Sequence, residues 1–390
     1  MIFLGLPQKD LMKILAVCNQ VSPKRNEAEV FTFTKVLVTK ENVKFEAINS
    51  SSYYTASVSP LNLDLSEEAV EFLVKTEVLT SSVALITDEI VSFEVDLEKS
   101  NLFVQGPKSK HTLRINTDLL ADFVAPVENL ENLEGVVTAK SNELSEAIKS
   151  SFIAVGQAKN VYEPKFLNVC FTVNPNENKF FIVSTDRYRV SKTKVEATFS
   201  NLKADNQEVK NYLVLPKGLQ FLLAAVGSEA EISLNFYSDL FVVAFGQQKL
   251  ILHYGEGNYP DYDKIIPQSF TCSFILSSKD LQDGLKQVYL FARSNTINKS
   301  VSVKIDPTEK KLILSSTTDE GYASEANIGL QNYEGPSENW SQSFNADYLL
   351  EYVSGVKTEN ILWESNPGKP SVLSPENERE RQIYLVSGLK

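Results

Sequence analysis

A short hairpin-like pattern occurs three times along this chain of 390 residues. Its copies lie at residues 43–58, 179–190 and 311–323, and each combines alternating apolar residues, a corner of Ser, Thr, Asn or Asp, and an aromatic residue. Alternation with a period of two predicts strands, and polar corners of this kind are typical of turns. Because the copies are well over 100 residues apart, they predict duplicated domains and not a solenoid, whose units are shorter.

Length and composition are typical of a globular protein with two or three domains, because 390 residues exceed one ordinary core and 43% are hydrophobic. The net charge of −12 argues against holding nucleic acid by bulk electrostatics, which needs many Lys and Arg residues at phosphates. No apolar run of about 18 residues predicts a membrane span, and residues 1–7 lack the basic start of a signal peptide. Cys18, Cys170 and Cys272 are interpreted as reduced core residues of a cytosolic protein.

Each third of the chain shows the same order of helix, hairpin, helix and further strands. Apolar residues at helical spacing predict three first helices, at 8–20, 144–155 and 281–292. Three second helices are predicted, from Ser66 through residue 74, at 215–226 and at 349–356. In the first third, strands are predicted at 30–39, 43–48, 82–87, 90–96, 102–105 and 111–115. We therefore expect an α+β fold of three repeated domains, at 1–128, 129–262 and 263–390.

The residues that usually carry catalysis are sparse. The two histidines, His111 and His253, lie in strand-like segments without a Cys/His cluster at metal-ligand spacing. No glycine-rich phosphate loop is present, and no nucleophile, base and orienting group occur together. These observations predict a protein that is not an enzyme and that uses no cofactor or metal, and they leave a hydrolase with an unrecognised site as a remote alternative.

Four motifs resemble those of one family. Ser-Thr-Asp-Arg-Tyr-Arg-Val at 184–190 resembles the Ala-Thr-Asp-Gly-His-Arg-Leu signature of the bacterial sliding clamp, the β subunit of the replicative DNA polymerase. The segment 259–267 is similar to that family's linker, 344–350 to a helix start, and 383–389 to its apolar tail. The motifs follow the family's order and spacing over nearly the whole chain.

The resemblance implies a ring. In the family, two three-domain chains pair head-to-tail into a homodimer of six domains that encircles double-stranded DNA without reading its sequence. The net charge does not exclude this, because encirclement needs only a locally positive hole. The replicative polymerase, the clamp-loader ATPase, other polymerases and repair proteins dock by short peptides in a groove between the second and third domains. The resemblance implies that the protein acts in the cytoplasm, at the nucleoid, and has no membrane partner.

The resemblance also implies which residues of this chain form the family's functional sites, wherever the motifs match. The groove residues implied are Leu167, Thr185, Arg187, Tyr188, Arg189, Val190, Pro260, Lys264, Ile265, Leu385, Val386, Ser387, Gly388 and Leu389. The DNA-facing residues implied are Lys9, Lys13, Lys24, Arg25, Lys149, Lys217, Lys286 and Arg293. The dimer-interface residues implied are Leu290 and Phe291.

The chain also departs from the family pattern and leaves alternatives open. Arg187 replaces a glycine, Tyr188 a histidine and Gly388 a proline, so we expect a narrower or more basic groove with an altered peptide preference. Val190, Ile265 and Val386 could be plain interdomain core, and the lysines could be ordinary solvent-facing residues. Because acidic residues at 67, 68 and 71 fall on a predicted helix, a docking scaffold that does not encircle DNA is the alternative function.

Overall fold

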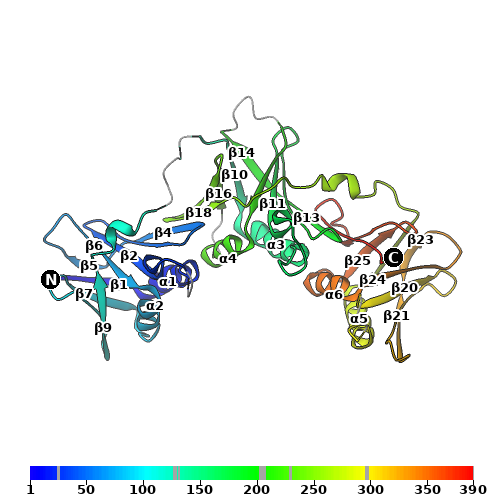
Figure 1. Ribbon diagram of the computed structural model, residues 1–390, viewed down its shortest axis with the longest axis horizontal. Coiled ribbons are helices and arrows are strands. Elements are labelled where there is room, and N and C mark those ends of the chain that lie inside the picture. Colours follow the sequence, from blue (N-terminus) through cyan, green and yellow to red (C-terminus); the bar gives the residue numbers. More distant parts are fainter. Residues whose placement is uncertain are drawn as a thin grey trace. The chain divides into compact units, whose positions relative to one another are not determined.

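A computed structural model describes residues 1–23, 27–125, 130, 132–201, 208–227, 231–294 and 298–389 (Figure 1). The chain divides into two compact units. Unit 1 comprises Met1–Asn142, Ala197–Gln207 and Val214–Tyr254, and unit 2 comprises Glu143–Glu196, Glu208–Leu213 and Gly255–Lys390. Within the described residues, six α-helices accompany three sheets, which confirms the expected α+β class. The three domain boundaries expected from the sequence stay a prediction.

Unit 1 is built on a sheet of fourteen described strands, whose recorded pairings are antiparallel. In sheet order they are β14 (Ala197–Ser200), β10 (Gly135–Lys140), β16 (Glu231–Phe236), β17 (Leu240–Phe245), β18 (Gln248–His253), β4 (Ser52–Val58), β3 (Val43–Ile48), β2 (Phe33–Thr39), β6 (Ala69–Lys75), β9 (Ser109–Asn116), β8 (Asn101–Gly106), β7 (Ile90–Asp96), β1 (Ile2–Pro7) and β5 (Asn62–Asp64). Its helices are α1 (Gln8–Val21), α2 (Thr76–Ala84) and α4 (Pro216–Ala225), and α1 packs against both others.

The predicted second helix of the first domain is wrong. Residues 69–75 form the strand β6, which pairs with β2 along its whole length and with β9 at its end, and helix α2 begins only at Thr76. The strand expected at 82–87 is wrong for the same reason, because α2 continues to Ala84. Val70, Phe72 and Val74 are buried at a spacing of two, which fits a strand with one face packed against the core. The acidic residues at 67, 68 and 71 therefore lie on no helix.

The first strand predicted, at 30–39, begins with a 3₁₀ turn. Residues Glu29–Thr32 form this turn, and the strand β2 starts at Phe33. The first helix is confirmed, since Leu11, Ile14, Leu15 and Cys18 form its buried face. No helix of the described residues is long and apolar enough to cross a membrane.

Unit 2 contains two sheets whose recorded pairings are also antiparallel. The nine-stranded sheet has the order β15 (Lys210–Val214), β11 (Val169–Asn174), β12 (Lys179–Thr185), β13 (Arg189–Val195), β27 (Gln382–Val386), β26 (Ser371–Pro375), β25 (Asn360–Ser365), β19 (Cys272–Ser277) and β23 (Gln331–Glu334). The four-stranded sheet has the order β22 (Ala323–Gly329), β21 (Lys311–Thr317), β20 (Ser300–Asp306) and β24 (Trp340–Asn345). Its helices are α3 (Ser141–Ser151), which enters the unit at Glu143, α5 (Ser278–Ala292) and α6 (Ala346–Gly355).

Each α-helix of the described residues follows a strand, so a strand–helix pair recurs along the chain. The strands β1, β10 and β19 run directly into α1, α3 and α5, and these three strands were missed by the sequence patterns. The strands β6, β15 and β24 lead in the same way into α2, α4 and α6. The three expected hairpins are confirmed as β3–β4, β12–β13 and β21–β22.

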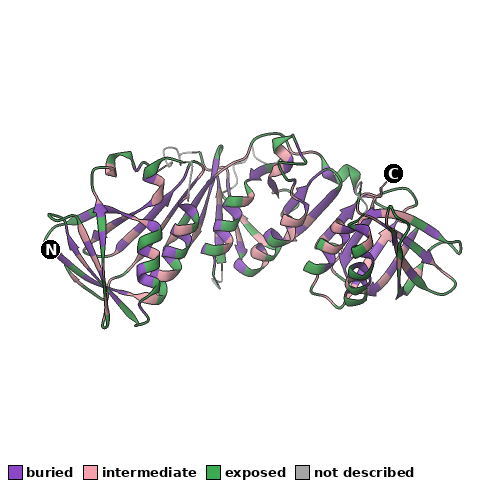
Figure 2. Ribbon diagram, turned by 60° about the horizontal axis from the view of Figure 1, so that its bottom comes forward, coloured by how far each residue is buried: buried purple, intermediate pink, exposed green. Residues whose placement is uncertain are grey.

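The cores lie between the helices and the sheets. Figure 2 shows many buried residues along the strands, whereas the helices carry buried and exposed residues side by side. The largest cluster described in unit 2 packs α5 and α6 against the strands around Phe274 and Trp363. Cys18, Cys170 and Cys272 are buried and free, as expected of core residues. Burial raises the pKa of Cys170 to about 12, so this thiol stays protonated at neutral pH.

Candidate partner-binding site

The corner of the β12–β13 hairpin is held by its own side chains. Asp186 Oδ1 accepts hydrogen bonds from the backbone N–H groups of Tyr188, at 3.0 Å, and Arg189, at 3.2 Å. Thr185 Oγ1 accepts one from the N–H of Arg187 at 3.1 Å. Short polar side chains close turns in this way because they replace backbone acceptors. The tight corner leaves Arg187 with a φ of 84°, in the left-handed region that favours glycine.

Arg189 ties this corner to helix α6. Its side chain is 7% exposed, and its Nε donates to Asp186 Oδ2 at 2.9 Å. Its Nη1 donates to Glu351 on α6, and its guanidinium lies 4.1 Å from the ring centroid of Tyr348. Burial works against the charge, but Tyr384, Asp186 and Glu351 outweigh it and raise the pKa of Arg189 above its usual value. The cation is therefore buried but fully paired, the condition under which a buried charge is tolerated.

The C-terminal strand β27 lies next to the hairpin in the nine-stranded sheet. Strand β27 pairs with β13 so that Val386 lies opposite Arg189 and Leu385 opposite Val190. The tail then leaves the strand, and the N–H of Ser387 donates to the Tyr188 carbonyl at 2.8 Å. Residues that are far apart in the sequence are thus brought together at one place.

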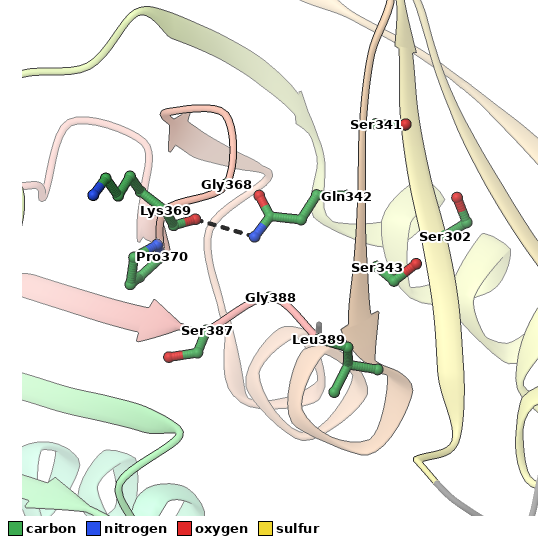
Figure 3. Close-up of a pocket in the computed structure, with 10 residues that line it drawn as sticks. All are labelled: Ser302, Ser341, Gln342, Ser343, Gly368, Lys369, Pro370, Ser387, Gly388 and Leu389. Atoms are coloured by element: carbon green, nitrogen blue, oxygen red, sulfur yellow. Dashed lines mark hydrogen bonds between the residues drawn. The ribbon is translucent and has the colours of Figure 1, made fainter.

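The tail then reaches β24, the edge strand of the four-stranded sheet. The N–H of Leu389 donates to the Ser343 carbonyl of β24 at 2.7 Å. Gly388 lies directly on Gln342, since a Cβ at Gly388 would come within 1.8 Å of Gln342 Nε2. Figure 3 shows this tail beside Gln342, whose Nε2 donates to the Lys369 carbonyl at 3.1 Å. A cavity of about 550 Å³ adjoins the tail, so space remains beside it.

The predicted groove residues fall into three groups. Those that are exposed are Arg187, Tyr188, Lys264 and Ile265. Those that are half-buried are Leu167, Pro260, Ser387, Gly388 and Leu389. Those that are buried are Thr185, Arg189, Val190, Leu385 and Val386. The side chains of the buried group pack inside the protein. Those of the exposed group, such as Tyr188 (59% exposed) and Ile265 (49% exposed), are open to contact by a partner.

Of the three residues for which plain interdomain core was the alternative, two are buried and one is exposed. Val190 and Val386 are 1% and 0% exposed, and Val190 belongs to an apolar cluster with Leu385 and Tyr262. Ile265 differs, because about half of its surface is open to solvent. Its side chain is therefore available for contact with another molecule, whereas those of Val190 and Val386 are not.

The segment before Ile265 is anchored to the strands β11 and β13. Tyr262 donates its hydroxyl hydrogen to Thr172 Oγ1 at 3.0 Å, and its ring meets that of Tyr259 edge-on at 6.3 Å. Lys192 Nζ lies 2.5 Å from Asp263 Oδ1. Burial raises the pKa of Tyr259, so its phenol stays neutral. These contacts fix the position from which Lys264 and Ile265 project.

Some residues at this site were not assigned from the sequence. Asp186, Tyr348 and Glu351 surround Arg189, and Gln342 supports the tail. The sequence could have pointed to two of them, because Asp186 lies in the motif at 184–190 and Tyr348 in the motif at 344–350. Glu351 and Gln342 carry no local signal, since their partners are distant in the sequence.

The predicted DNA-facing residues lie on helices or outside the described residues. Lys9 and Lys13 are exposed on α1, Lys149 on α3, Lys217 on α4 and Lys286 on α5, and Arg293 is exposed just after α5. Lys24 and Arg25 lie outside the described residues. Lys13 lies 3.6 Å from Asp10 and Lys286 lies 3.8 Å from Asp283, whereas no ion pair of the described residues includes Lys9, Lys149 or Lys217.

The residues suggested for a dimer interface lie at the end of α5. Leu290 is 55% exposed and Phe291 is half-buried. Within the described part of the chain, no group of three or more His, Cys, Asp or Glu residues could hold a metal ion.

The positive φ at position 187 leads to a prediction. We expect Arg187→Gly to be more stable than Arg187→Ala by about 1 kcal/mol, because only glycine adopts this backbone conformation without strain. Urea unfolding followed by tryptophan fluorescence measures the difference. If the alanine variant equals or exceeds the glycine variant, the corner does not hold residue 187 in the left-handed region.

Comparisons with known proteins agree with this architecture. The family described as DNA polymerase III beta subunit, C-terminal domain, matches residues 263–386. The chain is similar to the beta sliding clamp of Borreliella burgdorferi, with 28% identity over 223 residues, or 57% of this chain and about half (54%) of that protein. It is also similar to the beta sliding clamp of Rickettsia felis, with 22% identity over 414 residues and 100% of both chains.

A solved structure shows the same fold. The DNA polymerase III beta subunit of Thermotoga maritima has a TM-score of 0.84 to this chain, with 16% identity and 100% of both chains covered. The fold expected from the repeated hairpins is thereby confirmed.

Proposed function

Because the chain belongs to the family of bacterial beta sliding clamps, we propose that it is a processivity ring for DNA replication. Two chains close head-to-tail around duplex DNA, and the ring tethers the replicative polymerase. The clamp-loader ATPase, other polymerases and repair proteins use the same docking surface. The ring performs no catalysis itself and acts in the bacterial cytoplasm, at the nucleoid.

The observation that carries the docking part of this proposal is the junction of β13 and β27. The buried pair Val190 and Leu385 joins the central hairpin to the C-terminal strand within one continuous sheet. Tyr188 is exposed beside the half-buried tail, whose Ser387 N–H donates to the Tyr188 carbonyl, and Ile265 is exposed on the segment that Lys192 binds through Asp263. An extended peptide can place apolar side chains against such a surface, while backbone groups of the tail offer hydrogen bonds.

DNA contact is assigned to the exposed lysines of the helices. Lys9, Lys149 and Lys217 have no carboxylate partner among the described residues, so their charge is available to phosphates. Contacts to phosphates carry no sequence information, which suits a ring that must slide. The scaffold alternative lost its main argument when the acidic residues at 67, 68 and 71 proved not to be helical.

The deciding experiment tests encirclement. Light scattering should first give a mass near twice 43.6 kDa for the free protein. The labelled protein, loaded by its clamp loader onto a nicked circular plasmid, should then co-elute with the plasmid and dissociate when a restriction enzyme makes the plasmid linear. A topological link is lost at free ends, whereas ordinary binding is not.

Two outcomes would contradict the proposal. A protein that stays on the plasmid after linearisation binds by contact and does not encircle. A protein that remains monomeric and never co-elutes with circular DNA, yet still binds the polymerase, acts as a docking scaffold. The same loading reaction without ATP serves as the control, because a closed ring then has no route onto circular DNA.

A further inference from the structure

A second cavity in unit 2 lies apart from the tail and the hairpin corner. It has a volume of about 570 Å³ and opens between helix α3 with its following 3₁₀ turn (Phe152–Ala154) and the segment after α6. Its inner wall is the junction of β13 and β27, where Thr193 pairs with Gln382. Thr193 and Ser191 share one face of β13, and Ser191 Oγ donates to the Ser150 carbonyl of α3. The volume falls within the usual range for small-molecule pockets.

Two hydroxyl groups in the wall of this cavity have no hydrogen-bond partner among the described residues. They belong to Thr193, which is 4% exposed, and Tyr352, which is 2% exposed. Both side chains are held in place, Thr193 by the paired strand and Tyr352 by stacking on Tyr384 with a centroid distance of 4.6 Å. Buried polar groups are almost always paired in folded proteins, so two such groups facing one cavity point to a ligand that accepts hydrogen bonds.

The mouth of the cavity is positively charged. Lys357 Nζ lies 2.7 Å from Glu146, and Arg381 lies 3.5 Å from Glu146 and 3.3 Å from Glu378. Lys149, also at the mouth, has no carboxylate partner among the described residues. Three cations thus face two carboxylates, and the excess charge favours an anion.

Apolar side chains form the remaining wall. Ile153 and Val356 are half-buried and pack against the main core cluster of unit 2, and Pro375 is buried. Ligand pockets commonly combine an apolar lining with a few polar groups that orient the ligand.

We propose that this cavity binds a small organic anion with an apolar body. The body contacts Ile153 and Val356, a carbonyl-type oxygen accepts hydrogen bonds from the hydroxyls of Thr193 and Tyr352, and a carboxylate lies near Lys149. The site does not depend on the proposed ring function, because all of its residues belong to unit 2 of one chain.

The test uses three matched probes observed by fluorine NMR with the full-length protein. The first, 4-acetyl-3-fluorobenzoate, has both the acceptor and the carboxylate. The second, 4-ethyl-3-fluorobenzoate, lacks the acceptor, and the third, 4-acetyl-3-fluorobenzamide, lacks the charge. The acetyl acid should bind saturably, and each analogue should bind at least about fivefold more weakly.

The matching protein variant is Thr193→Val/Tyr352→Phe, which removes both hydroxyls and nearly keeps the side-chain shapes. We expect about tenfold weaker binding of the acetyl acid and unchanged binding of the ethyl acid. Ser341→Ala/Ser343→Ala removes two hydroxyls from the separate cavity beside the tail and should change neither affinity. Tryptophan fluorescence verifies that each variant is folded.

Two results would overturn the proposal. One is the absence of a saturable shift for the acetyl acid up to a concentration of about 5 mM. The other is equal binding of the acetyl acid to the wild-type protein and to Thr193→Val/Tyr352→Phe, which would place the probe elsewhere.

Discussion

Asp186→Ala is expected to lower the unfolding free energy of unit 2 by about 3 kcal/mol or more. The side chains of Asp186 and Arg189 are 9% and 7% exposed, so the substitution leaves a buried cation whose one remaining carboxylate partner, among the described residues, is Glu351. It also removes the acceptor of two backbone N–H groups at the corner. Breaking a buried ion pair from one side is costly because the remaining charge stays desolvated.

The measurement is favourable in this chain because both tryptophans, Trp340 and Trp363, lie in unit 2. Urea unfolding followed by tryptophan fluorescence therefore reports on the unit that contains the pair. The double variant Asp186→Ala/Arg189→Met should recover much of the loss, since it removes the orphaned charge as well. Glu351→Gln is a second control and should cost less than about 1 kcal/mol, because Glu351 is 48% exposed.

A loss below about 1 kcal/mol for the single variant would contradict this account of the corner. It would mean that Arg189 can turn to solvent and that the ion pair does not hold the hairpin to α6. The docking surface would then lack the rigid support that we assign to it.

Lys9→Glu/Lys217→Glu is expected to weaken binding of a short duplex to the dimer by at least about tenfold at low salt. Both lysines are exposed, on α1 and α4, and have no ion-pair partner among the described residues. If each lysine neutralises one phosphate, removing it should make the slope of log affinity against log salt shallower by about 1. Fluorescence anisotropy of a labelled duplex at several salt concentrations measures both quantities.

The matched control is Lys40→Glu/Lys249→Glu. These lysines are also exposed and in unit 1, but Lys40 lies between β2 and β3 and Lys249 lies on β18. The net charge changes by the same amount, so only the position of the charge differs. If both double variants weaken DNA binding equally, overall charge governs the interaction and the helices have no special role.

The sequence by itself determined the local structure and its threefold repetition. Alternation within the hairpins and helical spacing in α1, α4, α5 and α6 depend on neighbouring residues, so these elements could be predicted. The corner at Asp186 could be predicted for the same reason, because its acceptor serves N–H groups two and three residues further on. The motifs of the family lie largely on these same elements.

Where the local sequence pattern fitted more than one type of secondary structure, the tertiary structure determined which one formed. The apolar residues at 69–74 fit a helix or a strand, and pairing with β2 made them a strand. The strands β1, β10 and β19 are short segments before a helix, and their partners are supplied by other parts of the chain. Pairing of this kind depends on residues far along the chain, which short-range periodicity cannot reveal.

The site itself is the clearest case of tertiary control. Val190 meets Leu385, and Arg189 meets Glu351 at a sequence separation of 162 residues. No local pattern specifies such partners, because they are chosen by how the hairpin, α6 and the last strand pack together. The same packing buries Val190 and leaves Ile265 exposed, although the sequence presents both simply as apolar residues. The family motifs could therefore suggest which residues form the proposed surface, but only packing determined which of them are exposed.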